Sequence, residues 1–399
     1  MIKNFMFTSE SVTEGHPDKL CDQISDSIVD YLLTQDPYSK VRAECAVSAA
    51  ILFIAARFES TAQVDFARLA RKTIKRIGYV HPDFNPQSCS ILTSPQALPI
   101  DEALRFDEAT LSSQEIDRIP VKNQATVFGF ACNQTPDLMP FPIWLAHKLA
   151  RQLTTVRQKN ILPYLMPDGR VQVGVNYTDR NPENIHSLVI HVHQQTPAKP
   201  DQKTLSMDIM DTVIKPVCES SIICPDKKTK ILINPEGPYL GGPVHHSGLT
   251  GRKSAIDTYG EYTRHSGKAL SGKDPSRIDR IGAYAARYVA KNFVAAGLAG
   301  ECEVMISYSP GLSRPVSLMV QTMGTSQIPD EKLTQMAQEH FDFRFAALLK
   351  KFNLRHLPAN NPKGFYQKLA AYGHFGRTDM DLPWEKTDMA DILKKEAGI

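Results

Sequence analysis

The densest group of residues that could do chemistry lies between Gly237 and Arg280. Glycine recurs along this stretch together with seven Lys and Arg side chains, which are Arg252, Lys253, Arg264, Lys268, Lys273, Arg277 and Arg280. Glycines let backbone N–H groups approach a ligand closely, and the basic side chains add positive charge. The combination predicts a polyphosphate-binding segment, and the alternative is a flexible basic loop on the surface.

Part of this stretch resembles a P-loop without being one. The residues from Gly267 to Asp274 nearly match the pattern G-x-x-x-x-G-K-[ST]. Asp274 stands where the metal-binding hydroxyl belongs, however, and no apolar strand precedes the segment. Because both features are needed for the P-loop mechanism, we reject a P-loop NTPase.

A second candidate site lies near the N-terminus, where Gly15-His16-Pro17-Asp18 forces a turn at the entry to a helix. A His and an Asp in such a turn could bind phosphate and magnesium, and Asp18 would also meet the positive end of the helix dipole. Asp22, Asp26 and Asp30 follow at i+4 steps on the same helix face. We expect function for His16 and Asp18, whereas Asp22 and Asp30 are expected to face water.

Asp279 is the second candidate metal carboxylate. Magnesium takes one or two protein carboxylates together with substrate phosphate oxygens. Asp18 and Asp279 together would fit such a site, although they lie far apart in the sequence.

Composition excludes several function classes. The chain has 399 residues, 42% of them hydrophobic, with 46 Lys and Arg against 43 Asp and Glu and a net charge of +3. This is the composition of a globular protein of several domains, without the basic excess that non-specific nucleic-acid binding requires. We therefore expect no nucleic-acid partner.

Cysteine usage and hydropathy indicate the compartment. The seven cysteines are scattered and form no C-x-x-C pair, which argues against structural zinc or a disulfide framework and favours a reducing compartment. The longest run of small and apolar residues, 49–56, is too short to cross a bilayer. The expected location is the cytoplasm, with no membrane partner.

A pattern of two strands, a helix and a further strand recurs along the chain. The expected strands are 41–48 with 49–58, 170–177 with 187–193 after a turn at 180–184, and 302–308 with 315–321. The expected helices are 64–77, 205–217 and 331–352, and single strands are expected at 89–94 and 230–235. The pattern predicts an α+β fold of mostly antiparallel sheets with helices on one face. The predicted units are 1–105, 115–236 and 237–399, with discontinuous spatial domains.

Taken together, these stretches resemble the S-adenosylmethionine synthetase family. The resemblance is carried by residues 7–26 (FTSESVTEGHPDKLCDQISD), 248–253 (GLTGRK), 271–280 (SGKDPSRIDR), 283–299, 370–377 (AAYGHFGR) and 382–388 (LPWEKTD). It spans nearly the whole chain in order. It implies three similar α+β domains about a pseudo-threefold axis, and a homodimer or dimer of dimers with active sites shared between two chains.

The resemblance also implies a reaction and its residues. A thioether sulfur attacks C5′ of ATP, triphosphate leaves, and the triphosphate is hydrolysed to phosphate and pyrophosphate. The implied ATP and triphosphate residues, the first four of them catalytic, are His16, Lys273, Arg252, Lys253, Arg170 and Asn123. The implied metals are two Mg²⁺ ions at Asp18 and Asp279 and a K⁺ ion at Glu44.

Departures from the family pattern concentrate on the methionine side of the site. Arg57 stands where the family has a Glu that holds the methionine ammonium, and His245 and His246 replace a Gly-Asp with the same task. Asn123, Arg170 and Arg277 replace an Asp and two Lys. The expected thioether-binding residues are Arg57, Glu59, Gln96, His246 and Arg277.

Three hypotheses follow from these departures. Glu59 could replace the missing acid, so that methionine remains the substrate, because a two-residue slip keeps the same strand face. The thioether could instead lack the α-ammonium, as 4-methylthio-2-oxobutanoate does. The third hypothesis is a nucleotide-binding regulatory homologue, which the retained His16, Asp18, Lys273 and Asp279 disfavour.

Overall fold

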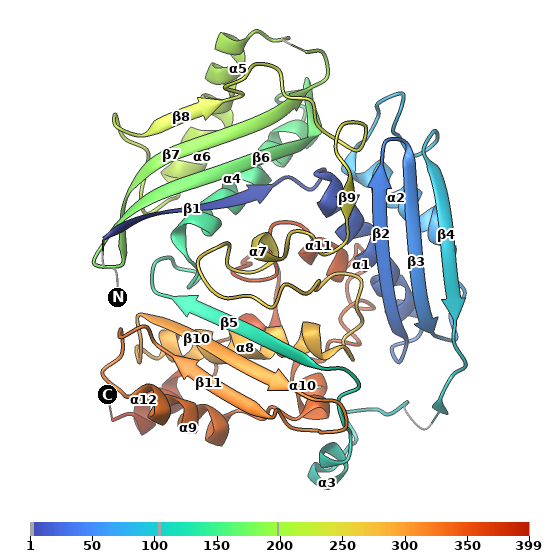
Figure 1. Cartoon of the computed structure of the whole chain (residues 1–399), viewed down its shortest axis with the longest axis vertical. Coiled ribbons are helices and arrows are strands. Elements are labelled where there is room, and N and C mark those ends of the chain that lie inside the picture. The colour runs from blue at the N-terminus through green and yellow to red at the C-terminus, as the bar shows by residue number, and fades with distance from the viewer. Residues whose placement is uncertain (1–3, 103–104, 198, 399) are drawn as a thin grey trace.

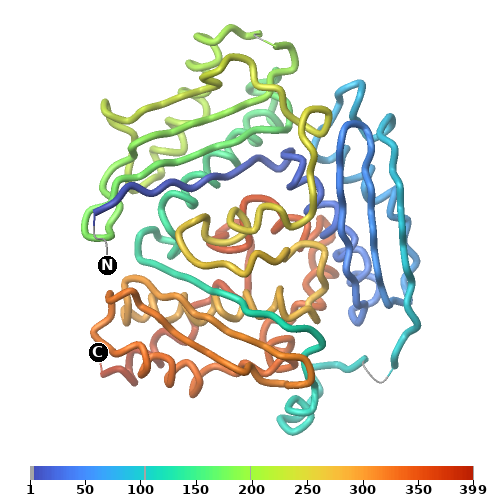
Figure 2. The backbone as a smooth tube through the Cα atoms, viewed as in Figure 1, coloured from blue at the N-terminus to red at the C-terminus, as the bar shows by residue number. Residues whose placement is uncertain are grey.

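The computed structural model describes residues 4–102, 105–197 and 199–398. Three sheets surround a common centre, with helices packed against a face of each (Figure 1). The segment from Gly237 to Lys273 crosses this centre between the sheets, as the yellow trace in Figure 2 shows. The α+β fold class expected from the sequence is therefore confirmed.

The first sheet is built mainly from the N-terminal quarter of the chain. Its strands, in spatial order, are β4 (Ser90–Ala97), β3 (Ile51–Glu59), β2 (Lys40–Ser48) and β9 (Gly248–Leu249). Helices α1 (Pro17–Gln35) and α2 (Phe66–Ile77) cover one face. Alternation along β2 buries Val41, Ala43, Cys45 and Val47 on that side. The opposite face exposes large apolar side chains, which are Ile51 (50%), Phe53 (43%), Leu92 (55%) and Leu249 (47%).

The second sheet joins the start of the chain to its middle. Its strands, in spatial order, are β1 (Phe5–Val12), β6 (Leu165–Thr178), β7 (Asn181–Gln194) and β8 (Lys230–Ile233). The long helix α4 (Phe141–Gln158) packs on β1 and β6. Between β7 and β8 the chain runs through α5 (Gln202–Ile209), a π-helical turn at Met210–Ile214 and α6 (Lys215–Glu219).

The third sheet has the spatial order β11 (Ser317–Gln321), β10 (Glu301–Tyr308) and β5 (Ala125–Cys132). Helix α8 (Ile278–Ala295) lies so close to β5 that a Cβ on Gly129 would come within 2.0 Å of the Ala286 backbone. The remaining helices are α3 (Ser113–Asp117), α7 (Ser254–Asp257), α9 (Asp330–His340), α10 (Phe345–Phe352), α11 (Tyr366–Leu369), a 3-10 turn at Pro383–Glu385 and α12 (Ala390–Glu396).

Two sheets contain a parallel pair that the repeat did not specify. β3 pairs with β4, and β7 with β8, in parallel register. In each case helices lie between the two strands in the sequence, and such a crossover returns the chain in the same direction. Strands β1, β5 and β9 were not expected, and each joins a sheet formed mainly by residues far away in the sequence.

Two local expectations were wrong. The helix expected over 331–352 is interrupted, because Phe341 is extended and Phe341 and Phe343 are buried by tertiary packing. Asp342 also accepts hydrogen bonds from the backbone and guanidinium of Arg344, which favours a turn there. The turn expected at 180–184 lies instead at Asp179 and Arg180, which both have positive φ, and β7 begins at Asn181.

No helix in the described ranges is both long and apolar enough to cross a bilayer. All seven cysteines are free, and six of them are buried.

A buried histidine on α4 predicts a specific pH dependence of stability. His147 bonds Ser11 Oγ through Nδ1 at 2.8 Å, and burial lowers its pKa to about 3. Between this value and the unfolded pKa near 6.5, the unfolded chain binds the extra proton, so acidification destabilises the fold. The variant His147→Asn has no imidazole to protonate, so it lacks this pH-dependent loss. The wild type should lose its advantage over the variant in free energy of unfolding by about 1.4 kcal/mol per pH unit below about pH 6.5, and urea titrations at several pH values would measure this difference. A difference that stays constant with pH would contradict this assignment.

Candidate active site

The acids of α1 are anchors for distant loops. Asp18 accepts the backbone N–H of Leu249, Asp22 that of Gly251 and Asp26 that of Gly272. Asp30 accepts three backbone N–H groups, from residues 365–367. The expectation that Asp22 and Asp30 face water was wrong, because both are buried and paired with these groups. One helix face thus fixes the Gly-rich segment at three points.

The first cluster of predicted residues lies at the start of α1. We call it the His16 cluster, and its members are His16, Asp18, Arg170, Arg252 and Lys253. Arg252 Nη1 lies 3.7 Å from Asp18 Oδ1, and Lys253 Nζ lies 3.3 Å from Glu10 Oε1. Burial, and after it the positive charges of Arg170 and Lys253, lower the pKa of His16. Positive charge here exceeds negative charge, which suits an anionic ligand.

His16 is a neutral hydrogen-bond donor. Its pKa is lowered to about 2, first by burial and then by the neighbouring cations. Its Nδ1 caps α1 by accepting the backbone N–H of Asp18 at 3.2 Å. We assign the proton to Nε2 because Nδ1 is an acceptor. Nε2–H is then free to donate to a ligand oxygen.

The second cluster lies near the start of α8, and we call it the Asp279 cluster. Its members are Asn123, Lys268, Lys273 and Asp279. Asp279 Oδ2 lies 3.2 Å from both Asn123 Nδ2 and Lys273 Nζ. Lys268 Nζ lies 3.3 Å from Asp279 Oδ1. Burial lowers the pKa of Lys273, and Asp279 opposes this shift.

One chain does not bring the two clusters together. The His16 cluster lies beside Asp18, whereas Gly272 and Arg280, which flank the Asp279 cluster, bond Asp26. Asp18 and Asp26 are eight residues apart on α1, or about 12 Å along its axis. Within one chain, a single ion therefore cannot be bound by both Asp18 and Asp279.

Two predicted residues of the first sheet, Arg57 and Gln96, form a row with Arg42 on its exposed face. Arg42 of β2 lies opposite Arg57 of β3, and Arg57 lies opposite Gln96 of β4. Lys273 forms a β-bridge with Arg42, so the row starts at the Asp279 cluster. Cross-strand neighbours project from the same face.

Glu59 lies two pairs further along the same strands, opposite Lys40, and already has hydrogen-bond partners. Both of its carboxylate oxygens lie within hydrogen-bond distance of Lys40 Nζ, at 3.1 and 3.2 Å, and Oε1 also accepts the Asp101 N–H. A carboxylate bound in this way has little capacity left for a substrate ammonium.

The remaining predicted residues lie apart from this row. The ring of His246 stacks on the ring of Tyr239. Positive charge on His246 contributes to lowering the pKa of His16, so His246 lies beside the His16 cluster. Arg277 lines a cavity that Lys40 and Glu59 also line. Glu44 is exposed and paired with Arg42. One exposed, paired carboxylate does not fit a K⁺ site within a single chain.

Two residues near the clusters were missed at the sequence level. Asp168 is buried, accepts the Gly242 N–H at 2.7 Å and leaves Oδ1 without a hydrogen bond. Burial raises its pKa to about 6, although Arg170 opposes this shift. The sequence feature that could have identified Asp168 is its position two residues before Arg170. In the sequence, Lys268 is one of many basic residues, and only the folded structure shows that it pairs with Asp279.

The residues fit magnesium at Asp279 and Asp18. Asp279 Oδ1 is buried and accepts no hydrogen bond from the described residues, and Lys268 Nζ lies 3.3 Å from it as an ion-pair partner. Asp18 Oδ2 lies 3.7 Å from His16 Nδ1. Carboxylate oxygens that accept no hydrogen bond are suitable ligands for a hard cation.

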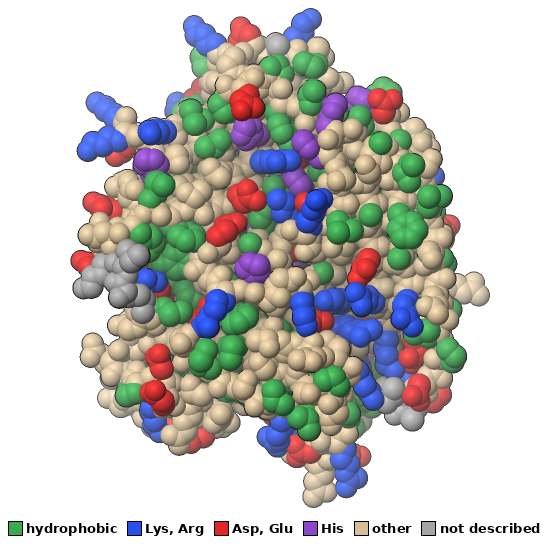
Figure 3. Space-filling model, viewed as in Figure 1, with side chains coloured by type: hydrophobic (Ala, Val, Ile, Leu, Met, Phe, Trp, Pro, Cys, Tyr) green, Lys and Arg blue, Asp and Glu red, His purple; other side chains and the backbone are tan. Residues whose placement is uncertain are grey.

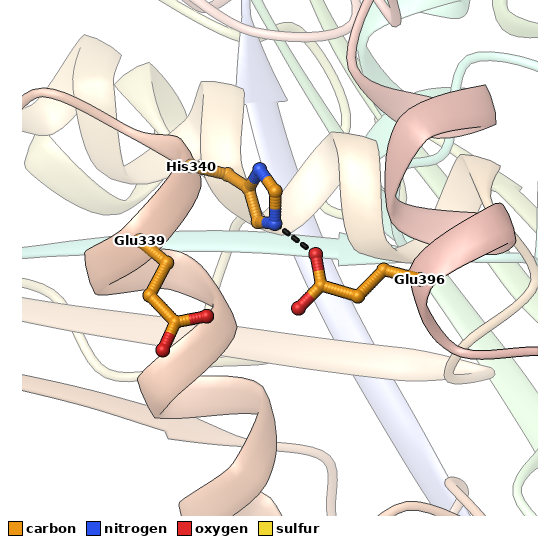
Figure 4. Close-up of side chains that lie close together, drawn as sticks. All are labelled: Glu339, His340 and Glu396. Carbon is orange, nitrogen blue, oxygen red and sulfur yellow. Dashed lines mark hydrogen bonds and ion pairs between the residues drawn. The ribbon is translucent and has the colours of Figure 1, made fainter.

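A third group of metal-binding side chains lies elsewhere. In the described ranges, Glu339, His340 and Glu396 alone place three such atoms within 4.8 Å of one another. They come from the ends of α9 and α12, and His340 bonds Glu396 directly (Figure 4). Glu339 also accepts a hydrogen bond from Gln335. The group therefore ties one helix end to another.

The surface reflects this distribution of charge. Figure 3 shows Lys and Arg side chains gathered on the face between the first sheet and β5, with histidines grouped farther up. Cations gather on this face although the net charge of the chain is only +3, so the electrostatic potential of the face attracts anions.

Comparison with known families agrees with this architecture. Models of the S-adenosylmethionine synthetase N-terminal, central and C-terminal domains match residues 4–97, 118–239 and 240–386. The S-adenosylmethionine synthase of Trichodesmium erythraeum is 47% identical, with 99% of this chain and 97% of the relative covered. Those of Gloeothece citriformis (99% and 97% covered) and Synechococcus sp. strain JA-3-3Ab (98% and 98%) are each 49% identical.

These matches define a class of three-domain α+β transferases. The chain belongs to the S-adenosylmethionine synthetase family. The family resemblance and the expectation of an enzyme of the methionine adenosyltransferase type are both confirmed.

The buried pair that positions the Asp279 cluster predicts a large loss of stability on mutation. Arg280 donates to both carboxylate oxygens of Asp26, at 2.9 and 2.7 Å, and both side chains are fully buried. Asp26→Asn leaves the guanidinium charge without a counter-charge and should cost about 3–5 kcal/mol. Chemical denaturation would measure this loss. Asp211→Asn, which breaks an exposed pair with Lys215, is the control and should lose far less. Equal losses in both variants would refute the anchoring role.

Proposed function

We propose that this chain catalyses attack of a thioether sulfur on C5′ of ATP, with release of triphosphate and its hydrolysis to phosphate and pyrophosphate. The observation that carries the proposal is the arrangement of cations. Each cluster surrounds one open carboxylate with several basic or neutral donors. A neutral sulfur nucleophile needs no base, so catalysis depends on stabilising the leaving polyphosphate, and preorganised donors do this best.

The chain's own residues would share this task. Arg170, Arg252 and Lys253 would bind the polyphosphate oxygens, and His16 would donate from Nε2 without changing protonation. Lys273 and Lys268 would meet the anion from the other side, and Asn123 would orient Asp279. Magnesium held at Asp18 and Asp279 would neutralise part of the triphosphate charge. The K⁺ ion at Glu44 remains a family-based expectation.

We propose that the complete site forms between two copies of the chain. On the exposed face of the first sheet, apolar side chains lie level with Leu249 at the His16 cluster, and Arg42 lies beside the Asp279 cluster four residues away along β2. Two such faces stacked about a twofold axis would place the His16 cluster of one copy against the Asp279 cluster of the other. The apolar patch would be buried in the same contact. A homodimer is the smallest such assembly, and we place it in the cytoplasm because all seven cysteines are free.

The identity of the thioether depends on Arg57 and Glu59. Glu59 is bound by Lys40, so it is not a free substitute for an ammonium-binding acid. Arg57 lies between Arg42 and Gln96, where a substrate ammonium would meet like charge. These contacts favour a thioether without the α-ammonium as the second candidate beside methionine. The retained cations disfavour a purely regulatory homologue.

Mixing of inactive variants tests the shared site. Lys273→Ala should lower kcat by about 10²–10³-fold, because it removes one preorganised donor, and Asp18→Asn should also be nearly inactive. After subunit exchange, activity should return to about a quarter of wild type, because half of the dimers are mixed and each has one intact site. Sulfonium product, measured by mass spectrometry, is the readout. No recovery, despite proven mixed dimers, would show that the site is not shared.

A double variant tests the thioether pocket. Arg57→Glu with His246→Asp restores acids where the family has them and should raise kcat/KM for methionine relative to 4-methylthio-2-oxobutanoate by at least tenfold. Lys227→Glu with Lys228→Gln removes the same formal charge at an exposed loop and serves as the control. Assays with ATP, Mg²⁺ and each thioether would measure the ratio. A ratio unchanged from wild type would exclude the altered pocket.

A further inference from the structure

A cavity of about 410 Å³ lies next to the Asp279 cluster, where the first sheet approaches the third unit. We call it the basic pocket. Its basic lining residues are Lys40, Arg118, Lys122, Arg277 and Arg355, and Glu59 is the one acid that lines it. Phe106, Ile119 and Phe345 provide apolar surface on the same cavity.

Two of the five cations are neutralised within the protein. Lys40 pairs with Glu59, and Arg355 pairs with the buried Glu108 at 2.7 Å. The side chains of Arg118, Lys122 and Arg277 make no hydrogen bond or ion pair with any described residue. Three cations without a bonded acid therefore line one cavity, and Arg118 alone among them has an acid nearby, Glu115, with which it interacts electrostatically. Like charges that line one cavity repel one another, so this arrangement favours an anionic occupant.

We propose that the basic pocket binds a small organic anion, with a phosphate or carboxylate group held by Arg118, Lys122 and Arg277 and an apolar body against Phe106 and Phe345. Arginine and lysine are the usual partners of these groups, and ligand sites combine apolar walls with a few converging polar groups. The volume suits a ligand of modest size.

The pocket shares its backbone with the Asp279 cluster. Lys122 immediately precedes Asn123, and Arg277 lies two residues before Asp279, while Asn123 and Asp279 bond each other at 3.2 Å. An anion that binds Lys122 and Arg277 contacts both of the backbone segments that position the Asn123–Asp279 hydrogen bond. The occupant is thus either the anionic end of the thioether substrate or a separate effector. In both cases the same cations would recognise a phosphate or carboxylate group. Only this link to catalysis rests on the proposed function.

Binding to the full-length protein tests the proposal. Phenyl phosphate, phenylacetate and inorganic phosphate would be titrated by calorimetry into wild type, Arg118→Gln with Lys122→Gln, and the control Lys227→Gln with Lys228→Gln. Both replaced residues of the first variant are exposed, so its fold should persist. Phenyl phosphate should bind wild type and the control equally and the pocket variant at least tenfold more weakly. Affinity for tripolyphosphate should change by less than twofold.

Kinetics would distinguish the two sources of the anion. A higher KM for the thioether in the pocket variant would identify the substrate as the occupant, and an unchanged KM with altered response to phenyl phosphate would identify an effector. Equal binding of phenyl phosphate to the pocket variant and wild type, or no binding at all, would overturn the proposal. If the protein forms no sulfonium product but the pocket variant still binds phenyl phosphate more weakly than wild type, the proposed function is wrong and the proposed anion site is supported.

Discussion

The row of carboxylates on α1 is the interaction on which the rest of the structure depends. Asp18, Asp22 and Asp26 each accept a backbone N–H from the segment between Leu249 and Gly272, so one helix face fixes this segment at both of its ends. Burying an acid without partners is costly, so each of these bonds is strongly specified. Asp22 is also bound by Lys19, and Lys19 bonds Asp257 in turn. The Gly-rich segment thereby takes its shape from a rigid helix, as preorganised catalysis requires.

The same helix separates the chemistry into two halves. Its first turn supports the His16 cluster, and its third supports the Asp279 cluster through Arg280. Each half carries more positive than negative charge around one carboxylate, so neither is complete alone. A highly charged leaving group between the two halves would satisfy both. This is the physical reason for expecting a second copy of the chain at the exposed face of the first sheet.

Local residue types predicted which residues take part in the chemistry better than they predicted where those residues lie in the fold. The turn before Asp18 and the bases around Lys273 were recognisable because each needs only neighbours in sequence. The roles of Asp22 and Asp30 were not, since the backbone N–H groups that they accept lie more than 200 residues away. For the same reason β1 and β5 were missed, as each completes a sheet built elsewhere. The break at Phe341 followed from tertiary packing that overrides helix periodicity, and the engagement of Glu59 by Lys40 depended on strand register.

The most direct test of the central claim is an experimental structure of the assembled protein with Mg²⁺ and a non-hydrolysable ATP analogue. The account predicts one triphosphate contacted by His16, Arg252 and Lys253 of one copy and by Lys273 of a second copy, with Asp18 and Asp279 from different copies at the metals. A triphosphate held entirely by one chain, or bound away from both clusters, would contradict it.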